Sequence, residues 1–334
     1  MRQVLRDAPD DVFGFGDARG RLEVRTALSS YLARVRGVRV DPACLVICSG
    51  YTEALRLLAE VFTDVGVTTV GMEDPTIGDH VRAVTPYLRV ADIPIDAEGL
   101  RIDVLRESGA EVAVCTPAHQ FPLGMTMSPG RRSALLGWAD EVGGWIVEDD
   151  YDGEFRYDRE PLGALQSRRP SRVVYAGSTS KTLGPAVRLG WIACPPLLLD
   201  ALTEAKRRAR QTSAVDQLAL CRMLETGDYD AYLRSVRRTY HRRRDLLVDA
   251  VATGLPGAGI RGIAAGLHAI VTLPPGLEEV STIERLRKAS IGVHSLTSYL
   301  RSDSCPPSLV LGYAAESGHK YPLAVNALIS KLKP

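Results

Sequence analysis

Short apolar runs alternate with longer amphipathic stretches along the first two thirds of the chain. Each short run is rich in β-branched residues and ends at a turn, which predicts a buried strand. The runs are CLVICSG, TTVGMEDP, EVAVCTP, WIVEDD and RVVYAGS, which begin at residues 44, 68, 111, 145 and 172. Alternating strands and helices are typical of a mainly parallel sheet sandwiched by helices, so we expect an α/β fold.

The stretches that separate these runs have the spacing of helices. Residues 51–66 carry apolar side chains at helical intervals, at Ala54, Leu55, Leu58, Ala59 and Phe62. Residues 77–88 and 128–144 have a similar pattern, and the Ser128-Pro129 pair favours the start of a helix.

The last third of the chain has a different pattern. Helical stretches near 197–210 and from Asp216 precede a strongly basic stretch at 237–252. Three apolar runs (LHAIVTLP, ASIGVHSL and PSLVLGYA) and a final helix follow, which predicts a smaller α+β domain. We expect three parts: an N-terminal segment at 1–36 that packs with the small domain, a large domain at 37–205 and a small C-terminal domain at 206–334.

Composition excludes several classes of protein. The 334 residues are 45% hydrophobic and 24% charged with a net charge of +1, which is ordinary for a soluble globular protein and gives no field that steers the chain to DNA. Leucines, a valine and tyrosines lie among the arginines of the basic stretch, so we interpret it as a solvated helix face. No DNA-binding motif is present, and we expect that this chain binds no nucleic acid itself.

The remaining sequence signals concern the compartment and metals. The six cysteines lie singly, mostly in apolar runs, and Cys44 and Cys48 have no partners for a zinc site, so we expect no metal. The N-terminus lacks the apolar core of a leader peptide, and no run reaches membrane-spanning length. We therefore expect a cytoplasmic protein without membrane contact.

Ligands of parallel sheets bind beyond the carboxyl ends of the strands, where this sequence places several polar residues. Ser49, Gly50, Tyr51 and Thr52 follow the first strand directly before a helix, and free amides at a helix start bind anions. Asp149 and Tyr151 follow the fourth strand and would point to the same side. Such an acidic cluster also fits a magnesium site or a turn cap.

The last predicted strand of the large sheet is followed by Ser178, Ser180, Lys181 and Arg188. Serine hydroxyls and an arginine fork suit a phosphate. On a turn near the core, burial and neighbouring cations would favour the neutral amine of Lys181, which a Schiff base requires. Phosphate donors, an amine and a carboxylate-phenol pair together fit pyridoxal 5'-phosphate, with Asp149 on its ring nitrogen and Tyr151 on its ring oxygen.

These residues lie in recognisable motifs. GSTSKTLGPAVRLGW resembles the lysine motif of fold-type-I aminotransferases, and VEDDYDGEFRYD resembles the aminotransferase-like domain of MocR-type regulators of the GntR superfamily. Residues 13–42, CTPAHQFPLG and VRRTYHRRRDLLV are similar to the same group, so the resemblance covers the chain from about Phe13 to its end. It implies the fold of type-I PLP-dependent transferases and a homodimer with active sites at the interface.

The resemblance also implies roles for individual residues. Lys181 would form the Schiff base and move the proton at the substrate Cα, and phosphate binding would fall to Tyr51, Thr52, Ser178, Ser180 and Arg188 with the Gly50 backbone. His119 stands where related aminotransferases have an asparagine beside the ring oxygen. Ile77 stands where the family has an aromatic ring stacked on the cofactor.

Two further departures affect the expected reaction. Val310 lies where many aminotransferases have the arginine that binds the substrate carboxylate, with Arg301 as a weaker substitute. No winged-helix domain is present, so the chain is either a free-standing enzyme or a piece of a longer regulator.

We therefore expect an aminotransferase that acts on an amino acid or related amine through a Lys181 Schiff base. Two alternatives stay open: a ligand-sensing effector domain of a MocR-type regulator that forms an external aldimine without turnover, or a PLP enzyme that catalyses elimination, decarboxylation or cyclisation.

Overall fold

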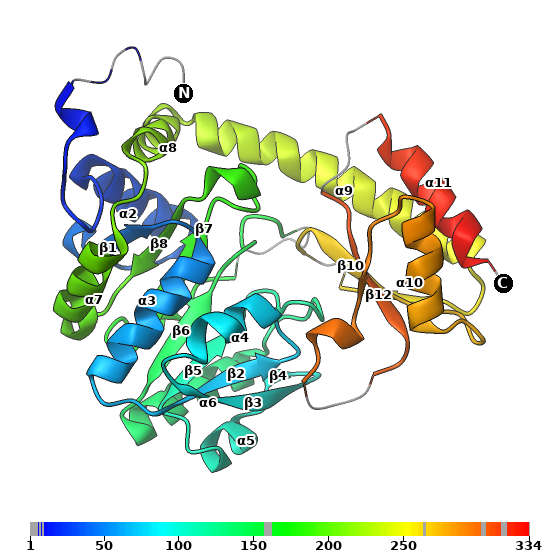
Figure 1. The fold of residues 1–334 in the computed structure, drawn as a ribbon, viewed down its shortest axis with the longest axis horizontal. Helices are drawn as coiled ribbons and strands as arrows, with labels where there is room; N and C mark the ends of the chain where they lie inside the picture. Colours follow the sequence, from blue (N-terminus) through cyan, green and yellow to red (C-terminus); the bar gives the residue numbers. More distant parts are fainter. Residues whose placement is uncertain are drawn as a thin grey trace.

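The structure, a computed structural model, describes residues 6, 8, 10–156, 162–262, 265–301, 305–314 and 319–333. Its main element is an eight-stranded sheet (Figure 1). The strands, in spatial order, are β1 (Leu45–Cys48), β8 (Gly190–Ala193), β7 (Val173–Ser178), β6 (Trp145–Asp149), β5 (Val112–Cys115), β2 (Thr69–Asp74), β3 (Arg89–Asp96) and β4 (Gly99–Leu100).

Six strands of this sheet run in the same direction. The pairs β2–β3, β2–β5, β5–β6 and β6–β7 are parallel, and β1 is antiparallel to β8, which is itself antiparallel to β7. The five strands that the apolar runs predict are therefore confirmed. Strands β3, β4 and β8 were not predicted, and β8 begins inside the lysine motif, where it looks like part of the loop.

Helices cover both faces of the sheet. Between the strands and just before β1 lie α2 (Leu22–Arg36), α3 (Tyr51–Asp64), α4 (Gly78–Val84), α5 (Ile102–Glu107), α6 (Pro129–Val142) and α7 (Pro196–Ala209). Short 3₁₀ turns occur at Asp10–Phe13, Pro42–Cys44, Gln166–Arg168, Pro185–Val187 and Thr297–Tyr299. The Ser128 hydroxyl accepts a hydrogen bond from the Arg131 amide at 3.1 Å, which confirms the predicted start of α6.

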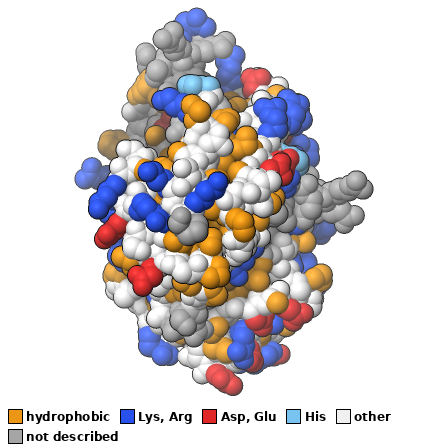
Figure 2. All heavy atoms as spheres, turned by 90° about the vertical axis from the view of Figure 1, so that its right-hand side faces the viewer, with side chains coloured by type: hydrophobic (Ala, Val, Ile, Leu, Met, Phe, Trp, Pro, Cys, Tyr) orange, Lys and Arg blue, Asp and Glu red, His pale blue; other side chains and the backbone are white. Residues whose placement is uncertain are grey.

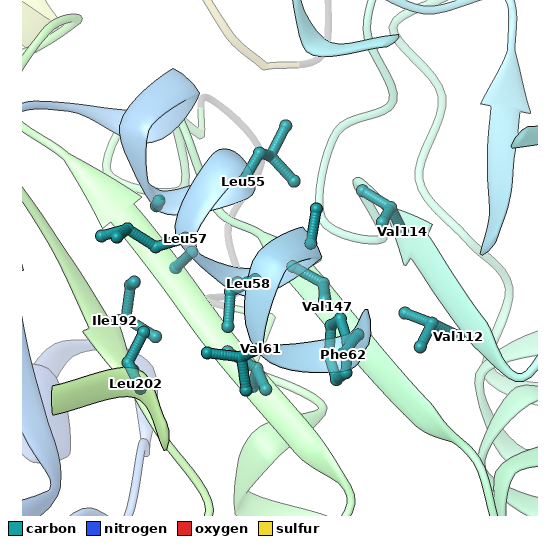
Figure 3. Close-up of a cluster of buried hydrophobic side chains, with 14 of the residues drawn as sticks. Leu55, Leu57, Leu58, Val61, Phe62, Val112, Val114, Val147, Ile192 and Leu202 are labelled. Atoms are coloured by element: carbon teal, nitrogen blue, oxygen red, sulfur yellow. The ribbon is translucent and has the colours of Figure 1, made fainter. Parts of the chain in front are cut away.

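The apolar side chains of the strands alternate between two layers of core. On one face, α3 buries Leu55, Leu58 and Phe62 against β5, β6 and β8, with α7 beside it (Figure 3). On the other face, α5 and α6 pack on β5 and β6, while α2, α8 (Ala214–Thr226) and α9 (Asp228–Gly254) pack on β1, β7 and β8. Burial on both faces explains why the strands read as continuous apolar runs.

The C-terminal part contains a separate four-stranded antiparallel sheet. Its strands, in spatial order, are β11 (His294–Ser295), β12 (Ser308–Gly312), β10 (His268–Thr272) and β9 (Gly259–Arg261). The helices are α8 (Ala214–Thr226), α9 (Asp228–Gly254), α10 (Glu279–Lys288) and α11 (Tyr321–Leu332). This confirms the expected α+β character of the last third, whereas the exact division into domains stays a prediction.

The 27-residue helix α9 links the two sheets. It begins beside α8 near the large sheet and ends beside α11 near the small sheet (Figure 1). On the small-sheet end of the molecule, basic side chains are interspersed with uncharged and hydrophobic ones (Figure 2). Within the described ranges, no helix is long and apolar enough to cross a membrane.

A buried ion pair ties α2 to the end of β6. Arg36, 3% exposed, donates to Asp150 from Nε at 2.5 Å and from Nη2 at 3.1 Å. The Tyr175 hydroxyl donates to the same carboxylate at 2.6 Å. The residue that directly follows β6 is thereby held by three hydrogen bonds from two other elements.

We expect Arg36→Met to lower the free energy of unfolding by about 3–5 kcal/mol, because it leaves the Asp150 carboxylate buried without its cation. Urea unfolding measures this loss. The matched control is Arg34→Met, two residues away, whose exposed pair with Asp230 contributes about 1 kcal/mol or less. Equal losses in the two variants would contradict the role given to the buried pair.

Candidate functional site

Strand direction brings the predicted site residues to one edge of the large sheet. Because β1, β2, β5, β6 and β7 run the same way, their carboxyl ends meet at that edge. The residues that follow these ends are Gly50, Tyr51 and Thr52 after β1, Ile77 after β2, His119 after β5, Asp149 and Tyr151 at β6, and Ser178, Ser180 and Lys181 at β7. The chemistry predicted from separate motifs is therefore concentrated in one region.

The turn after β1 forms an anion cradle. Gly50 has φ of 90° and caps α3, so the amides at the start of this helix are open to a ligand. A Cβ atom at Gly50 would lie 3.5 Å from the Arg188 guanidinium, which places that cation beside the helix start. Arg188 has φ of 49°, a left-handed conformation that is uncommon for a residue with a side chain.

The cradle is braced from behind by a lysine that the sequence reasoning missed. The Glu53 carboxylate accepts a hydrogen bond from the Ser49 amide and lies 3.1 Å from the Lys206 Nζ atom. Lys206 is only 1% exposed and also donates to the Thr212 hydroxyl at 3.2 Å. Lysine is almost never buried without a partner, but the pairing cannot be read from positions 153 residues apart.

Asp149 is a buried carboxylate with unmet bonding capacity. It is 4% exposed, and its Oδ1 atom has no hydrogen-bond partner among the described residues. Burial, together with the charges of Asp150 and Asp152, raises the pKa of Asp149 well above its ordinary value. The charge of Lys181 acts in the opposite direction. A second cation at this carboxylate would stabilise its ionised form.

Tyr51 lies beside this carboxylate. Its hydroxyl is buried and unpartnered within the described part of the chain, and burial followed by the Asp149 charge raises the pKa of Tyr51. The His80 ring packs edge-on against the Tyr51 ring with centroids 4.9 Å apart. Burial lowers the pKa of His80 to about 4, so this imidazole is neutral at physiological pH. His80 was not predicted, because a lone histidine in a short helix gives no signal.

His119 is joined to Tyr151 and to Asp152. Its Nδ1 atom lies 2.9 Å from the Tyr151 hydroxyl and 2.7 Å from the Asp152 Oδ2 atom. The Nε2 atom is buried and has no partner in the ranges that the structure describes. Sequence reasoning proposed His119 and Tyr151 but missed Asp152, which looks like an ordinary turn residue in the run EDDYD.

Lys181 differs from expectation in one respect. The sequence predicted that burial acts on its amine, and this was wrong, because the side chain is exposed at the mouth of the turn after β7. The turn itself is ordered by the Ser180 amide, which donates to the Ser178 hydroxyl at 3.4 Å, and by Thr179, which is fully buried. An exposed amine is accessible to a carbonyl compound that enters the site.

A second buried carboxylate, Glu73, was also missed. It ends β2 beside Asp74 and accepts hydrogen bonds from the Thr116 amide at 3.1 Å and from the Gln120 side chain at 3.3 Å. Burial raises its pKa to about 7. These bonds hold the loop after β5, which carries His119, against the end of β2. Ile77 follows on the same side, half-buried, directly before α4.

The residues considered for a substrate carboxylate have other surroundings. Arg301 is paired with Asp92 at 2.6 Å and donates to the Glu73 carbonyl at 3.2 Å, whereas its Nη1 atom is buried without a partner among the described residues. Val310 is buried in β12 and packs with Ile270 and Leu296. Phe121 and Tyr299 cover this group, and the Phe121 ring centroid is 6.1 Å from that of Tyr151. An apolar cluster of the small sheet thus reaches Tyr151 through the Phe121 ring.

Pyridoxal phosphate fits the donor set of this edge. Its phosphate matches the Gly50 turn with Arg188, its ring nitrogen matches the unpartnered Asp149 oxygen, and its aldehyde matches the accessible Lys181 amine. No cluster of three potential metal ligands occurs among the residues that the structure describes.

Comparison with known proteins agrees with this fit. The family model described as aminotransferase class I and II matches residues 1–299. The transcriptional regulator YhdI of Bacillus subtilis, described as an uncharacterised HTH-type protein, is 32% identical over 323 residues. That match covers 96% of this chain and 68% of YhdI. The probable rhizopine catabolism regulatory protein MocR of Rhizobium meliloti is 27% identical, with 99% of this chain and 68% of MocR covered.

Solved structures give the same result for the fold. The kynurenine aminotransferase of Pyrococcus horikoshii, determined with PMP, is 25% identical and has a TM-score of 0.86, covering 99% of this chain and 85% of that one. The family match spans most of the chain, and the fold, the lysine turn and the MocR-like motifs agree with it. The chain belongs to the aminotransferase class I and II family.

Proposed function

We propose that this chain binds pyridoxal phosphate through Lys181 and transfers the amino group of an amino acid or related amine. One observation carries the proposal: an anion cradle, an unpartnered buried carboxylate and an accessible lysine lie at one edge of one sheet. When bound, the cofactor supplies an aldehyde for the amine and a ring that withdraws electrons from the substrate Cα.

Six residues would hold the phosphate of the cofactor. The Gly50 backbone opens the start of α3, and Arg188 lies beside it with a guanidinium that can bind two oxygens. The others are Tyr51, Thr52, Ser178 and Ser180. The Lys206–Glu53 pair would orient the cradle from behind without touching the ligand.

The remaining residues would orient the ring and move protons. Asp149 would keep the ring nitrogen protonated, because a buried carboxylate without a partner strongly favours a cation at its Oδ1 atom. Tyr151 would lie at the ring oxygen with His119 behind its hydroxyl, and Ile77 would pack against the ring face. The Lys181 Nζ atom would take a proton from the substrate Cα and return it elsewhere on the reacting group.

The apolar side of the site points to the kind of substrate. Ile270, Leu296 and Val310 form a buried wall that Phe121 connects to Tyr151. A substrate carboxylate placed there would lose its hydration without a compensating cation. We infer that the preferred donor turns an apolar or aromatic side chain toward this wall.

A homodimer is the expected assembly. Phe13, Phe15 and Leu22 are exposed apolar residues near the N-terminus, with exposed fractions of 60%, 105% and 59%. Such side chains are covered in many proteins by a second subunit. Dimerisation, location in the cytoplasm and absence of nucleic-acid binding by this chain stay predictions.

A second function is favoured by the relatives. YhdI and MocR are described as regulators, and the part that matches this chain is about two thirds of each. In that case the same residues would bind the cofactor and an amine as a signal, without release of a keto product.

We expect purified protein to acquire the yellow absorbance of lysine-bound pyridoxal phosphate, and Lys181→Ala to lose it, because only Lys181 offers its amine at the proposed site. Absorbance titration with the cofactor measures this. A yellow Lys181→Ala protein would show that another lysine carries the cofactor, and a colourless wild type would contradict the proposed function.

Arg188→Met should raise the Kd for pyridoxal phosphate by about 10- to 100-fold, the effect of losing charge-assisted hydrogen bonds to a phosphate. Equilibrium dialysis of the cofactor gives the constant. Arg207→Met is a suitable control, because Arg207 is exposed and paired with Glu204 on α7. A change of the same size in both variants would argue against a phosphate contact of Arg188.

Donors with apolar side chains, such as leucine and phenylalanine, should have kcat/KM values at least about tenfold higher than aspartate and glutamate, since burial of an unpaired carboxylate is unfavourable. Steady-state assays with a common keto acceptor measure the ratio. Preference for acidic donors would refute the inferred wall. Donors that change the absorbance of the bound cofactor without any keto product would favour the signalling function.

A further inference from the structure

A trio of side chains, His119, Asp152 and the partly exposed Tyr151, lies behind the predicted ring-oxygen position. The side chains of His119 and Asp152 are each 1% exposed, and the Tyr151 hydroxyl completes the group. Gly266 packs directly against this group, because a Cβ atom at that position would collide with the His119 ring and with the Asp152 carboxylate. Gly266 is held in place because its amide donates to the Phe155 carbonyl and its carbonyl accepts from the Tyr313 hydroxyl at 2.7 Å.

The distances fix where the protons of the trio lie. The His119 Nδ1 atom is 2.7 Å from a carboxylate oxygen, so it must carry a proton and donate it to Asp152. The Tyr151 hydroxyl, 2.9 Å from the same Nδ1 atom, then cannot donate to it and meets it as an acceptor. The hydroxyl proton of Tyr151 then has two possible acceptors: the Asp152 carboxylate, with which Tyr151 also interacts, and a ligand on the open side of the hydroxyl.

We propose that Asp152 and His119 form a positioning pair that turns the Tyr151 hydroxyl proton toward the ring oxygen of the cofactor. The inference rests on the proposed function. It adds His119 and Asp152 as residues that act through the Tyr151 hydroxyl. Without the His119 N–H, which occupies the Asp152 carboxylate, that carboxylate would be the stronger acceptor for the Tyr151 proton, and the hydroxyl would turn away from the ring.

Other titratable groups lie around His119, Tyr151 and Asp152, and they are the same in all the variants proposed below. Asp149 and Glu73 face Tyr151 from β6 and β2, and His268 on β10 lies with its ring centroid 5.3 Å from that of His119. Burial lowers the pKa of His268 to about 4, and the charge of Lys181 adds to this. His268 is therefore a neutral neighbour that donates to or accepts from no member of the trio, and its Nε2 atom bonds to the Pro122 carbonyl at 2.9 Å.

The test is the pH midpoint of the absorbance change of bound pyridoxal phosphate. A hydrogen bond to the ring oxygen stabilises its negative charge and so lowers the proton affinity of the nitrogen that links the cofactor to Lys181. Tyr151→Phe should raise the midpoint by about one pH unit, the size expected for a lost hydrogen bond to a charged oxygen. His119→Ala should raise it in the same direction by more than half as much.

The double variant decides whether His119 acts through Tyr151. We expect His119→Ala combined with Tyr151→Phe to have the midpoint of Tyr151→Phe alone, because the pair has no function once the hydroxyl is absent. His119→Asn, which keeps an N–H donor, should return the midpoint toward that of the wild type. His268→Asn, the matched buried control, should leave it unchanged. Additive shifts, or an unshifted His119→Ala midpoint, would overturn the proposal.

A measurement on the protein without cofactor separates this inference from the proposed function. The His119 Nδ1–H proton should give a far-downfield, slowly exchanging signal in the ¹H NMR spectrum that disappears in both His119→Ala and Asp152→Asn. Persistence of every such signal in Asp152→Asn overturns the positioning pair. A wild type that never becomes yellow refutes the proposed function, whereas a yellow protein with an unshifted His119→Ala midpoint refutes only the pair.

Discussion

The end of β6 is the point on which the arrangement of the site depends. Asp149 faces the ligand side, and the next residue, Asp150, is fixed by Arg36 and Tyr175. A buried carboxylate needs such partners, and here they come from α2 and from β7. The same bonds therefore set the direction of Asp149, the distance between β6 and β7, and the packing of α2 on the sheet.

Acid groups in β2, in β6 and just after β6 have raised pKa values. Glu73, Glu148 and Glu154 each have a pKa raised to about 7, in every case first through burial. Backbone amides and side-chain donors offset part of this cost, as in the two amides that bind Glu148 at 2.9 Å and 3.1 Å. A strand end rich in bound carboxylates is a rigid support for groups that must meet a ligand at fixed positions.

The sequence predicted the central part of this structure because its signals are local. Buried parallel strands have continuous apolar runs, and their ends carry the residues that meet at one edge, so Asp149, Lys181 and the Gly50 turn could be named without coordinates. Lys206, Asp152 and Glu73 could not, because each is defined by partners from distant segments. The exposure of Lys181 also escaped prediction, since a turn motif does not show how much chain covers it. Strand β8 was missed because it begins within the lysine motif, whose residues were interpreted by their chemistry rather than as a strand.

Helix α9 connects the large sheet to the small sheet over a long span. It runs without interruption through 27 residues, from the neighbourhood of α8 to that of α11, and contributes none of the proposed ligand contacts. At 1.5 Å per residue it is about 40 Å long, so a tilt of about 5° at one end moves the other by about 3.5 Å. That displacement exceeds the length of a hydrogen bond. A helix of this length therefore multiplies a small tilt at the large sheet into a displacement of several ångströms at the small sheet.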